Sequence, residues 1–510
     1  MVLPFLSEVQ NKSKKYSVVF RGINYGEGAQ DGEFAETYNL STSKYPCITQ
    51  RAARIKKGQY TQPTTLHAKG NLLIIDGTKV FYGGKEVGEV TEGKKQTATI
   101  GNYIVIFPDK KYYKVPTEED SDGEFGSMEE TYTATGLVFT DSTITTTGDS
   151  FKFREGDAVK ITGCSNVANN QHIIIDSVSE KVLTFYENTF TAGTESGSVT
   201  IKREVPDLDF ICESNYRLWG THGNKIYASK FSDPLNFAVL DGLADNSYEI
   251  EVGSEGEFTG CIPYSSHICF FKENTLHKLY GTKPSNFQIN TVNVYGVQSG
   301  SERSMHIVNE QLLYKGVGGI YSYTGGIPEL ISGKLGNKRF TDAVACCDGE
   351  TYYISMKQGD SYSLFAFDVM RNIWIREDDT HAVDMAFYDG SVHYVDSDGG
   401  LYYIDKSADR SDIEWGATFC TIHETMNERK GYSKFHLRMD LSAGAWLALD
   451  IKTDNDLQWR QIYTTHNEKA KTVSIPIMPT RCDSIDIRLR GRGECTIKAF
   501  VREFTVGSDI

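Results

Sequence analysis

Short runs of alternating apolar and polar residues, separated by Gly, Asn and Asp, recur along most of the chain. The clearest lies at residues 389–405, DGSVHYVDSDGGLYYID, where 392–395 and 401–404 read as two strands. Asp398, Gly399 and Gly400 between them tolerate the positive φ of a tight turn. This stretch is predicted to be one β-hairpin.

Similar units, each a Gly or Asn turn with an aromatic-rich strand, precede it. They are GTKVFYGGKEVG (77–88), GNKIYASKF (223–231), NTLHKLYG (274–281), GGIYSYTGG (318–326) and DGETYYISM (348–356). Residues 66–115 hold two strand pairs, the length typical of one four-stranded propeller blade. Five or six such units could close into a ring, which would remove exposed sheet edges. The pattern therefore predicts a β-propeller over residues 61–130 and 204–411.

Three segments depart from this pattern. Residues 1–60 are Gly-rich and polar, which predicts an N-terminal extended arm that enters along the sheet edges. Residues 131–203 are rich in Thr and Ser, and strands expected at 158–162, 172–178 and 182–186 indicate an inserted small β-barrel. Residues 412–510 carry longer alternating strands, typical of a C-terminal β-sandwich. The predicted class is all-β, and the best candidate for a helical turn is SGKLGNKRF at 332–340.

Composition and charge agree with a β-protein that does not grip DNA. The 510 residues include 47 Gly, 29 Tyr and 26 Phe against 9 Met, and the net charge is −15. Strong acidity disfavours sequence-independent binding to DNA or to an anionic membrane, because both require basic patches. The acidity either solubilises the surface or lines a channel wall that repels phosphates.

No segment indicates export or membrane insertion. The first residues, MVLPFLSEVQNKSKK, lack the basic and apolar regions of a signal peptide, and no run approaches about 18 apolar residues. The Asn-x-Ser matches at Asn11 and Asn39 are then expected to be chance. The ten cysteines include no CxxC pair, and the vicinal Cys346 and Cys347 are too close to bridge easily, so free thiols from a reducing cytosol are expected.

The acidic segment 116–130 leaves two interpretations open. Glu118, Asp120, Asp122, Gly123 and Glu129 occupy the first, third, fifth, sixth and twelfth positions of an EF-hand loop. The flanking YYKV and TYTA read as strands, however, and the first position is Glu instead of Asp. A solvated linker is therefore favoured over a calcium site.

Catalytic motifs are not apparent, and no catalytic, cofactor-binding or metal-ligating residues are predicted. The sequence contains no Walker loop, HExxH, GxSxG or GxGxxG between a strand and a helix. His267 and His277 lie in predicted strands and are expected to be structural, as are Cys212 and Cys269 in apolar runs. The chain is predicted not to be an enzyme.

Two further groups of residues suggest binding. Arg488, Arg490 and Arg492 alternate along one predicted strand and so share a face, which either meets an acidic partner or protects a solvated edge. Trp219, Trp374 and Trp415 would favour a carbohydrate-binding or glycan-hydrolysing propeller if they lined one surface.

The order of arm, hairpin array, insertion and closing sandwich resembles the tail hub or nozzle (packaged-DNA stabilisation) proteins of short-tailed bacteriophages. The resemblance rests on NLLIIDGTKVFYGGKEVGEV (71–90), YRLWGTHGNKIYASKFSDPLNF (216–237), FTGCIPYSSHICFFKENTLHKLYG (258–281) and the region from LQWRQIYTTH (457–466) to IRLRGRGECTIKAF (487–500). It covers most of the chain outside 131–203.

The resemblance implies a virion structural protein, made in the host bacterial cytoplasm and located in the tail. Such proteins form a homohexameric ring below the portal and adaptor proteins, continue the DNA channel, retain packaged DNA and open during ejection. Genomic DNA would pass an acidic lumen without specific binding. The insertion departs from the short version of the family, and a contact with tail fibres or with the neighbouring subunit is the hypothesis for it. No membrane span is expected. A tail baseplate or adhesin component is the remaining alternative.

Overall fold

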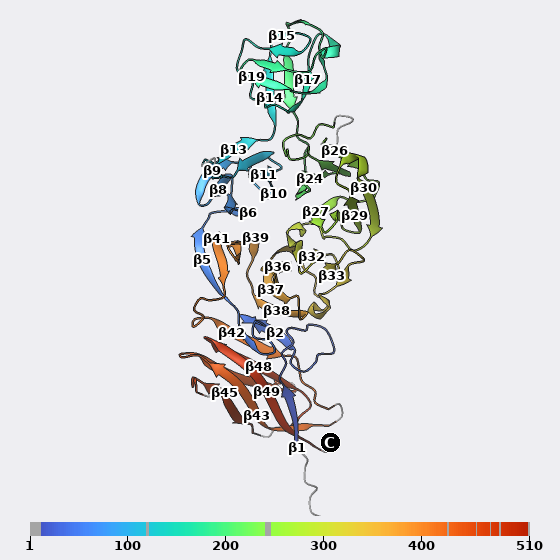
Figure 1. Cartoon of the computed structure of the whole chain (residues 1–510). Helices are drawn as coiled ribbons and strands as arrows, with labels where there is room; N and C mark the ends of the chain where they lie inside the picture. The colour runs from blue at the N-terminus through green and yellow to red at the C-terminus, as the bar shows by residue number, and fades with distance from the viewer. Residues whose placement is uncertain are drawn as a thin grey trace, which may run out of the picture. The chain divides into compact units, whose positions relative to one another are not determined.

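The computed structural model describes residues 12–118, 122–239, 246–425, 428–454, 456–469, 471–478 and 481–507. These residues form β-strands and short 3-10 turns with no α-helix among them, which confirms the all-β class (Figure 1). The turns are η1 (Val167–Asn169), η2 (Pro284–Asn286), η3 (Glu302–Ser304) and η4 (Gly333–Leu335). The last of these lies where a helical turn was predicted. Over the same residues, no helix has the length and apolarity to cross a bilayer.

The chain divides into two compact units, Thr61–Glu302 and the combination of Met1–Tyr60 with Arg303–Ile510. Outside the inserted segment, the first unit contains four antiparallel sheets of four strands each. They are β6 (Pro63–Lys69), β7 (Asn71–Asp76), β8 (Lys79–Tyr82) and β9 (Lys85–Glu89); β10 (Gln96–Ile100), β11 (Tyr103–Phe107), β12 (Lys111–Lys114) and β13 (Glu124–Ser127); β23 (Phe210–Ser214), β24 (Arg217–His222), β25 (Lys225–Ala228) and β26 (Tyr248–Glu251); and β27 (Phe258–Tyr264), β28 (His267–Lys272), β29 (Thr275–Tyr280) and β30 (Gln288–Asn293).

Two sequence predictions need correction here. Residues 66–115, predicted as a single blade, contain most of two sheets, because the strands are short and one sheet fits between Pro63 and Glu89. The acidic segment 116–130 is not wholly a linker, since β13 within it completes the second sheet by pairing with β12. The outer strands of these sheets are short and polar, and in sequence they look like connecting loops.

The inserted segment forms two antiparallel sheets within the same unit (Figure 1). One consists of β14 (Glu130–Ala134), β22 (Val199–Arg203), β17 (Ala158–Thr162) and β18 (His172–Ile174); the other of β19 (Ser177–Ser179), β20 (Val182–Thr184), β16 (Thr143–Thr145), β15 (Leu137–Phe139) and β21 (Gly193–Glu195). Phe139, Ile161, Leu183 and Ile201 belong to one apolar core that the sheets share. The strand predicted at 172–178 is divided between β18 and β19, so that its two halves belong to different sheets.

The second unit contains three more four-stranded sheets. They are β31 (His306–Val308), β32 (Gln311–Gly316), β33 (Gly319–Tyr323) and β34 (Glu329–Leu330); β35 (Thr341–Cys347), β36 (Thr351–Gln358), β37 (Ser361–Asp368) and β38 (Ile373–Asp378); and β39 (Ala382–Tyr388), β40 (Ser391–Asp396), β41 (Gly400–Asp405) and β5 (Ala53–Gln59). The hairpin predicted at 389–405 is confirmed, with His393 opposite Tyr403. Outside the insertion, the described residues thus contain seven four-stranded sheets, where five or six were predicted.

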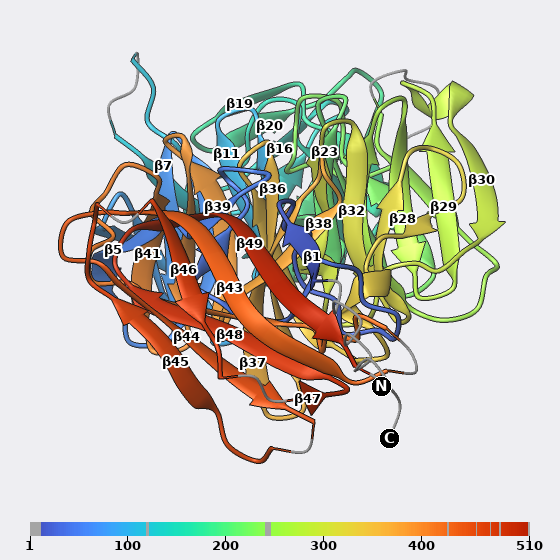
Figure 2. The same cartoon turned by 90° about the horizontal axis from the view of Figure 1, so that it is seen from below.

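Two larger sheets in the same unit pack on one shared apolar core. The seven-stranded sheet contains β3 (Leu40–Ser41), β4 (Ile48–Gln50), β49 (Cys495–Val506), β43 (Lys430–Leu441) and β46 (Thr472–Pro476), with β1 (Lys12–Ser17) on β49 and β47 (Arg481–Cys482) on β43 (Figure 2). The five-stranded sheet contains β2 (Phe34–Tyr38), β42 (Glu414–Phe419), β48 (Ile485–Arg492), β44 (Trp446–Thr453) and β45 (Arg460–Thr465). The region predicted as an extended arm is therefore extended but incorporated, because it supplies β1 to β5.

Aromatic side chains from both larger sheets hold this core together. The Phe34 and Phe419 rings are 4.8 Å apart, Phe419 and Phe500 are 5.6 Å apart, and Phe435 lies 5.1 Å from Phe500. Phe34 and Phe419 come from the five-stranded sheet, and Phe435 and Phe500 come from the seven-stranded sheet. Since burying one such side chain stabilises a fold by about 1.5–3 kcal/mol, this cluster anchors the N-terminal strands to the C-terminal region.

The pairing of β5 with β41 depends on one tight turn. Gly399 has φ +86°, and a Cβ atom at this position would lie 2.1 Å from the backbone oxygen of Tyr60. The Tyr60 N–H donates to the Gly399 carbonyl oxygen at 2.7 Å. Glycine is therefore required twice, for the left-handed backbone and for the close approach of the N-terminal segment.

We expect Gly399→Ala to destabilise the second unit by about 2–4 kcal/mol, through backbone strain together with displacement of the segment that follows β5. Gly390→Ala is the matched control, because Gly390 also has positive φ (+74°) but open space around its Cβ position. The control should cost only about 1 kcal/mol. Urea unfolding of both variants measures the difference, and equal losses would contradict the role given to the Tyr60 contact.

Candidate functional site

The tryptophans that would have indicated a carbohydrate surface are buried in three separate cores. Trp219, Trp374 and Trp415 are each at most 2% exposed. Each indole N–H donates to a backbone carbonyl, of Ser214 at 3.2 Å, Ile331 at 3.0 Å and Gly493 at 3.1 Å respectively. These side chains serve packing and do not line a common surface, so the sequence hypothesis for them is wrong.

The histidines and cysteines behave as structural residues. His277 lies between two hydroxyls, with Nε2 2.8 Å from Ser254 Oγ and Nδ1 2.8 Å from Thr291 Oγ1. Burial lowers its pKa to about 4. His267 is buried against the Tyr280 ring at 4.9 Å. All ten cysteines are free thiols in the structure, and a hydrogen bond with Cys261 together with burial raises the pKa of Cys212 well above its usual value.

The structure describes four of the five residues with the EF-hand-like spacing. Asp120 lies outside the described residues, and Glu129 is engaged by a lysine, as its Oε1 accepts a hydrogen bond from Lys110 Nζ at 3.0 Å. Over the described ranges no group of three or more His, Cys, Asp or Glu side chains is arranged to hold a metal.

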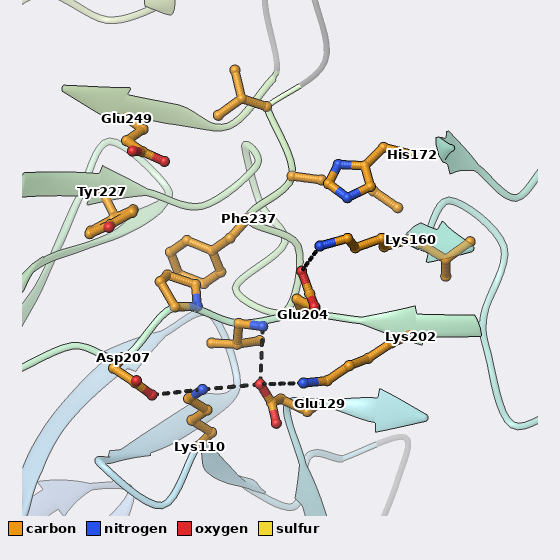
Figure 3. A pocket seen from close by; sticks show the side chains of 16 residues that line it. Lys110, Glu129, Lys160, His172, Lys202, Glu204, Asp207, Tyr227, Phe237 and Glu249 are labelled. Atoms are coloured by element: carbon orange, nitrogen blue, oxygen red, sulfur yellow. Dashed lines mark hydrogen bonds and ion pairs between the residues drawn. The ribbon is translucent and has the colours of Figure 1, made fainter. Parts of the chain in front are cut away.

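A cavity of about 480 Å³ lies where the chain enters and leaves the inserted segment (Figure 3). Lysine and carboxylate side chains face one another across it. Lys110 Nζ is 2.8 Å from Asp207 Oδ1 as well as bound to Glu129, and Lys160 Nζ is 3.7 Å from Glu204. Burial would lower the pKa of Lys110, but the hydrogen bonds that its ammonium donates to Asp207 and Glu129 outweigh burial and raise that pKa.

A buried ion pair also stabilises the region where the insertion joins the rest of the chain. Arg203, at the end of β22, pairs with Asp157, and both side chains are nearly inaccessible to solvent. Arg203 Nε donates to the Met128 carbonyl at 3.0 Å, and Asn236 Oδ1 accepts from the Ala158 N–H at 2.9 Å. These bonds join the insertion to the segments before and after it. The cavity therefore belongs to a charged junction at the base of the insertion.

A second candidate surface is the outer face of the five-stranded sheet. Arg488 and Arg490 project from β48 and converge on Asp450 of β44, whose side chain is only 2% exposed. Arg488 Nη2 and Arg490 Nε lie 2.7 Å and 2.8 Å from Asp450 Oδ2. The guanidinium of Arg488 also stacks over the Trp459 ring at 4.5 Å, and that of Arg490 over Trp446 at 5.8 Å.

This geometry corrects the sequence interpretation of the arginines. They do share a face, but β48 is an inner strand between β42 and β44, so they do not protect an edge. Arg492 pairs separately with the exposed Asp412 at 2.6 Å. The sequence analysis missed Asp450 and the two tryptophans. The sequence did contain a signal for them: strand alternation along residues 446–452, WLALDIK, places Trp446 and Asp450 on one face, as it does the arginines of 488–492.

Asp450 fixes the two arginines electrostatically. Burial alone would raise its pKa, but hydrogen bonds from Arg490 and Arg488 outweigh burial and hold that pKa below its ordinary value. The carboxylate therefore stabilises the fold above pH 4, and this contribution falls as the pH drops through the lowered pKa. The result is a pair of immobilised guanidinium groups between two half-buried indoles, a combination common at protein interfaces.

Comparisons with known proteins identify no family. No family model and no curated protein matches the chain. Among solved structures, BamB from Moraxella catarrhalis aligns with 70% of this chain and 97% of its own at 10% identity and a TM-score of 0.35. The computationally designed Ika8 protein aligns with 69% and 98% at 10% identity and a TM-score of 0.33. A Lactobacillus plantarum protein aligns with 72% and 92% at 9% identity and a TM-score of 0.30. Similarities at this level carry no functional information.

We expect Asp450→Asn to lower the free energy of unfolding by about 1–3 kcal/mol, since it leaves two partly buried guanidinium groups without their counter-ion. Asp412→Asn is the matched control, because Asp412 is 88% exposed and its pair with Arg492 contributes little. Urea unfolding at pH 7, followed by tryptophan fluorescence, measures both. The loss should shrink at pH 3, and a loss independent of pH would contradict the ionic role.

Proposed function

We propose that the chain is a structural protein of a bacteriophage tail: a hub or nozzle ring that continues the DNA channel, retains packaged DNA and lets it pass during ejection. The observation that carries the proposal is the series of four-stranded sheets, of which the last takes its fourth strand, β5, from the start of the chain. A series closed in this way supports a β-propeller, with the insertion as a small barrel and the two larger sheets as a C-terminal sandwich.

Such a body suits a channel wall because it resists pressure without any chemistry. Closure by β5 ties the ends of the series together, so the sheets cannot separate one at a time. A cyclic homohexamer of such bodies would use one heterologous interface repeated around the ring. Portal and adaptor proteins would lie on one side of the ring and further tail proteins or fibres on the other.

The charge of the chain supports the channel role. With a net charge of −15, carboxylates that face a lumen would repel phosphates and let genomic DNA slide without specific binding. The charged junction bonds the insertion to the segments before and after it, which supports a role for the insertion in contacting a fibre or a neighbouring subunit. A tail baseplate or adhesin component remains the alternative for which the same scaffold is suited.

Immunogold electron microscopy of phage particles, with antibody raised against the recombinant chain, tests the proposal. Gold directly below the capsid is the expected result. Gold at a distal baseplate or fibre would favour the adhesin, and particles without gold would overturn a virion role. Pre-adsorbing the antibody with the purified chain is the control for specific labelling.

A further inference from the structure

The outer face of the seven-stranded sheet carries a concentration of positive charge. Along β43, Phe435, Leu437 and Met439 point into the core, so the alternate residues point outward. The outward set on β1, β43, β49 and the adjoining turn is Lys12, Lys14, Lys434, Arg438, Lys471 and Lys498, here called the basic face. Figure 2 shows β43, β46 and β49 side by side with β1 next to β49.

Few carboxylates offset this charge. Glu503 accepts from Lys14 and His436, and Asp440 pairs with Lys471 and Lys498. Hydrogen bonds from Lys14 and His436 lower the pKa of Glu503 to about 2, so it stays ionised and holds β1 in place. Lys434 and Arg438 have no such partner on the described part of the chain. Tyr16, 59% exposed on the same strand as Lys14, adds an aromatic contact surface.

The opposite charge is concentrated in another part of the sequence. The segment Thr61–Glu302 contains 33 acidic and 20 basic side chains, a net charge of −13. The remainder contains 35 acidic and 33 basic side chains, a net charge of −2. Within the acidic segment, Glu251, Glu255 and Glu257 are exposed on and just after β26, the edge strand of its sheet. These three residues are called the acidic edge.

We propose that the basic face of one copy binds the acidic edge of a second copy, which makes a head-to-tail contact. The inference rests on the proposed ring and names the surfaces that would build it. A contact between two different surfaces of identical chains is heterologous, and it closes into a ring when the rotation between copies permits. Complementary charge speeds such encounters and excludes wrong orientations.

A second copy fits the basic face better than nucleic acid does. Duplex DNA would be attracted to the six cationic side chains, but its backbone presents phosphates of one sign only. The two carboxylates on the face, Glu503 and Asp440, would also oppose phosphates. A neighbouring copy supplies carboxylates together with an ordered sheet edge, which suits a flat face that carries both lysines and a tyrosine.

The test is self-association of the full chain, measured by sedimentation equilibrium in low and in high salt. Lys434→Glu with Arg438→Glu should weaken association in low salt about tenfold or more, since surface charge pairs contribute up to about 1 kcal/mol each. Arg339→Glu with Arg460→Glu is the matched control; both residues are exposed and the charge change is identical. The control should change association less than about twofold.

Charge exchange provides the specific readout. The Glu255→Lys, Glu257→Lys variant, measured by itself, should associate more weakly than the wild-type chain. A mixture of this variant with the Lys434→Glu, Arg438→Glu variant should associate again, because the exchanged charges are complementary. The inference would be overturned if the Lys434→Glu, Arg438→Glu variant associated as strongly as the wild-type chain, or if the mixture did not associate. It would also be overturned if the wild-type chain did not associate in low salt. The inference would be overturned as well if the chain bound duplex DNA and the Lys434→Glu, Arg438→Glu substitutions abolished that binding while self-association persisted. A tail location with unchanged association would overturn only this inference, whereas absence from particles would overturn the proposed function.

Discussion

The constraint on which the second unit depends is the pairing of β5 with β41. This ladder joins residues 53–59 to residues 400–405, so the sheet that ends the series cannot be completed until the first 405 of the 510 residues have been made. The Tyr60 hydrogen bond and the glycine at position 399 allow the approach. Residues 12–52 then lie close to the C-terminal sheets, where β1 to β4 add strands and Phe34 enters the common core.

Much of this architecture could be predicted from local patterns. The hairpin at 389–405 was predictable because two alternating strands flank a turn whose residues accept positive φ. The strand at 158–162 was predicted with its exact bounds as β17. The change to long alternating strands after residue 412 was also visible, because β43 carries the core residues Phe435, Leu437, Met439 and Leu441 at every second position.

Other features depend on contacts between distant residues and left little local signal. Residues 12–50 show no periodicity because their strands are short and each joins a sheet built mostly from residues beyond 411. The number of small sheets was underestimated because fourth strands such as β13 are polar and lie in turn-rich sequence. The arginines were assigned to one face correctly, but only the pairing of β48 with both β42 and β44 shows that they are central and that Asp450 lies beneath them.

The candidate site was likewise predictable in part from local patterns and in part only from contacts between distant residues. Alternation could place Arg488, Arg490 and Trp446 on a surface, but the buried carboxylate that fixes them required the fold. The same holds for the junction at the base of the insertion, where Lys110, Glu129 and Asp207 come from segments far apart in sequence. Charged groups at both places are engaged with one another and hold together strands and loops from different parts of the sequence.

The central claim is that this scaffold retains packaged DNA, and the most direct measurement is the DNA content of phage particles assembled without the chain. The account predicts that heads package DNA and then lose it, that the released DNA becomes sensitive to nuclease, and that addition of the purified chain before release restores infectivity. Particles that lack the chain and still keep their DNA and infect normally would contradict it.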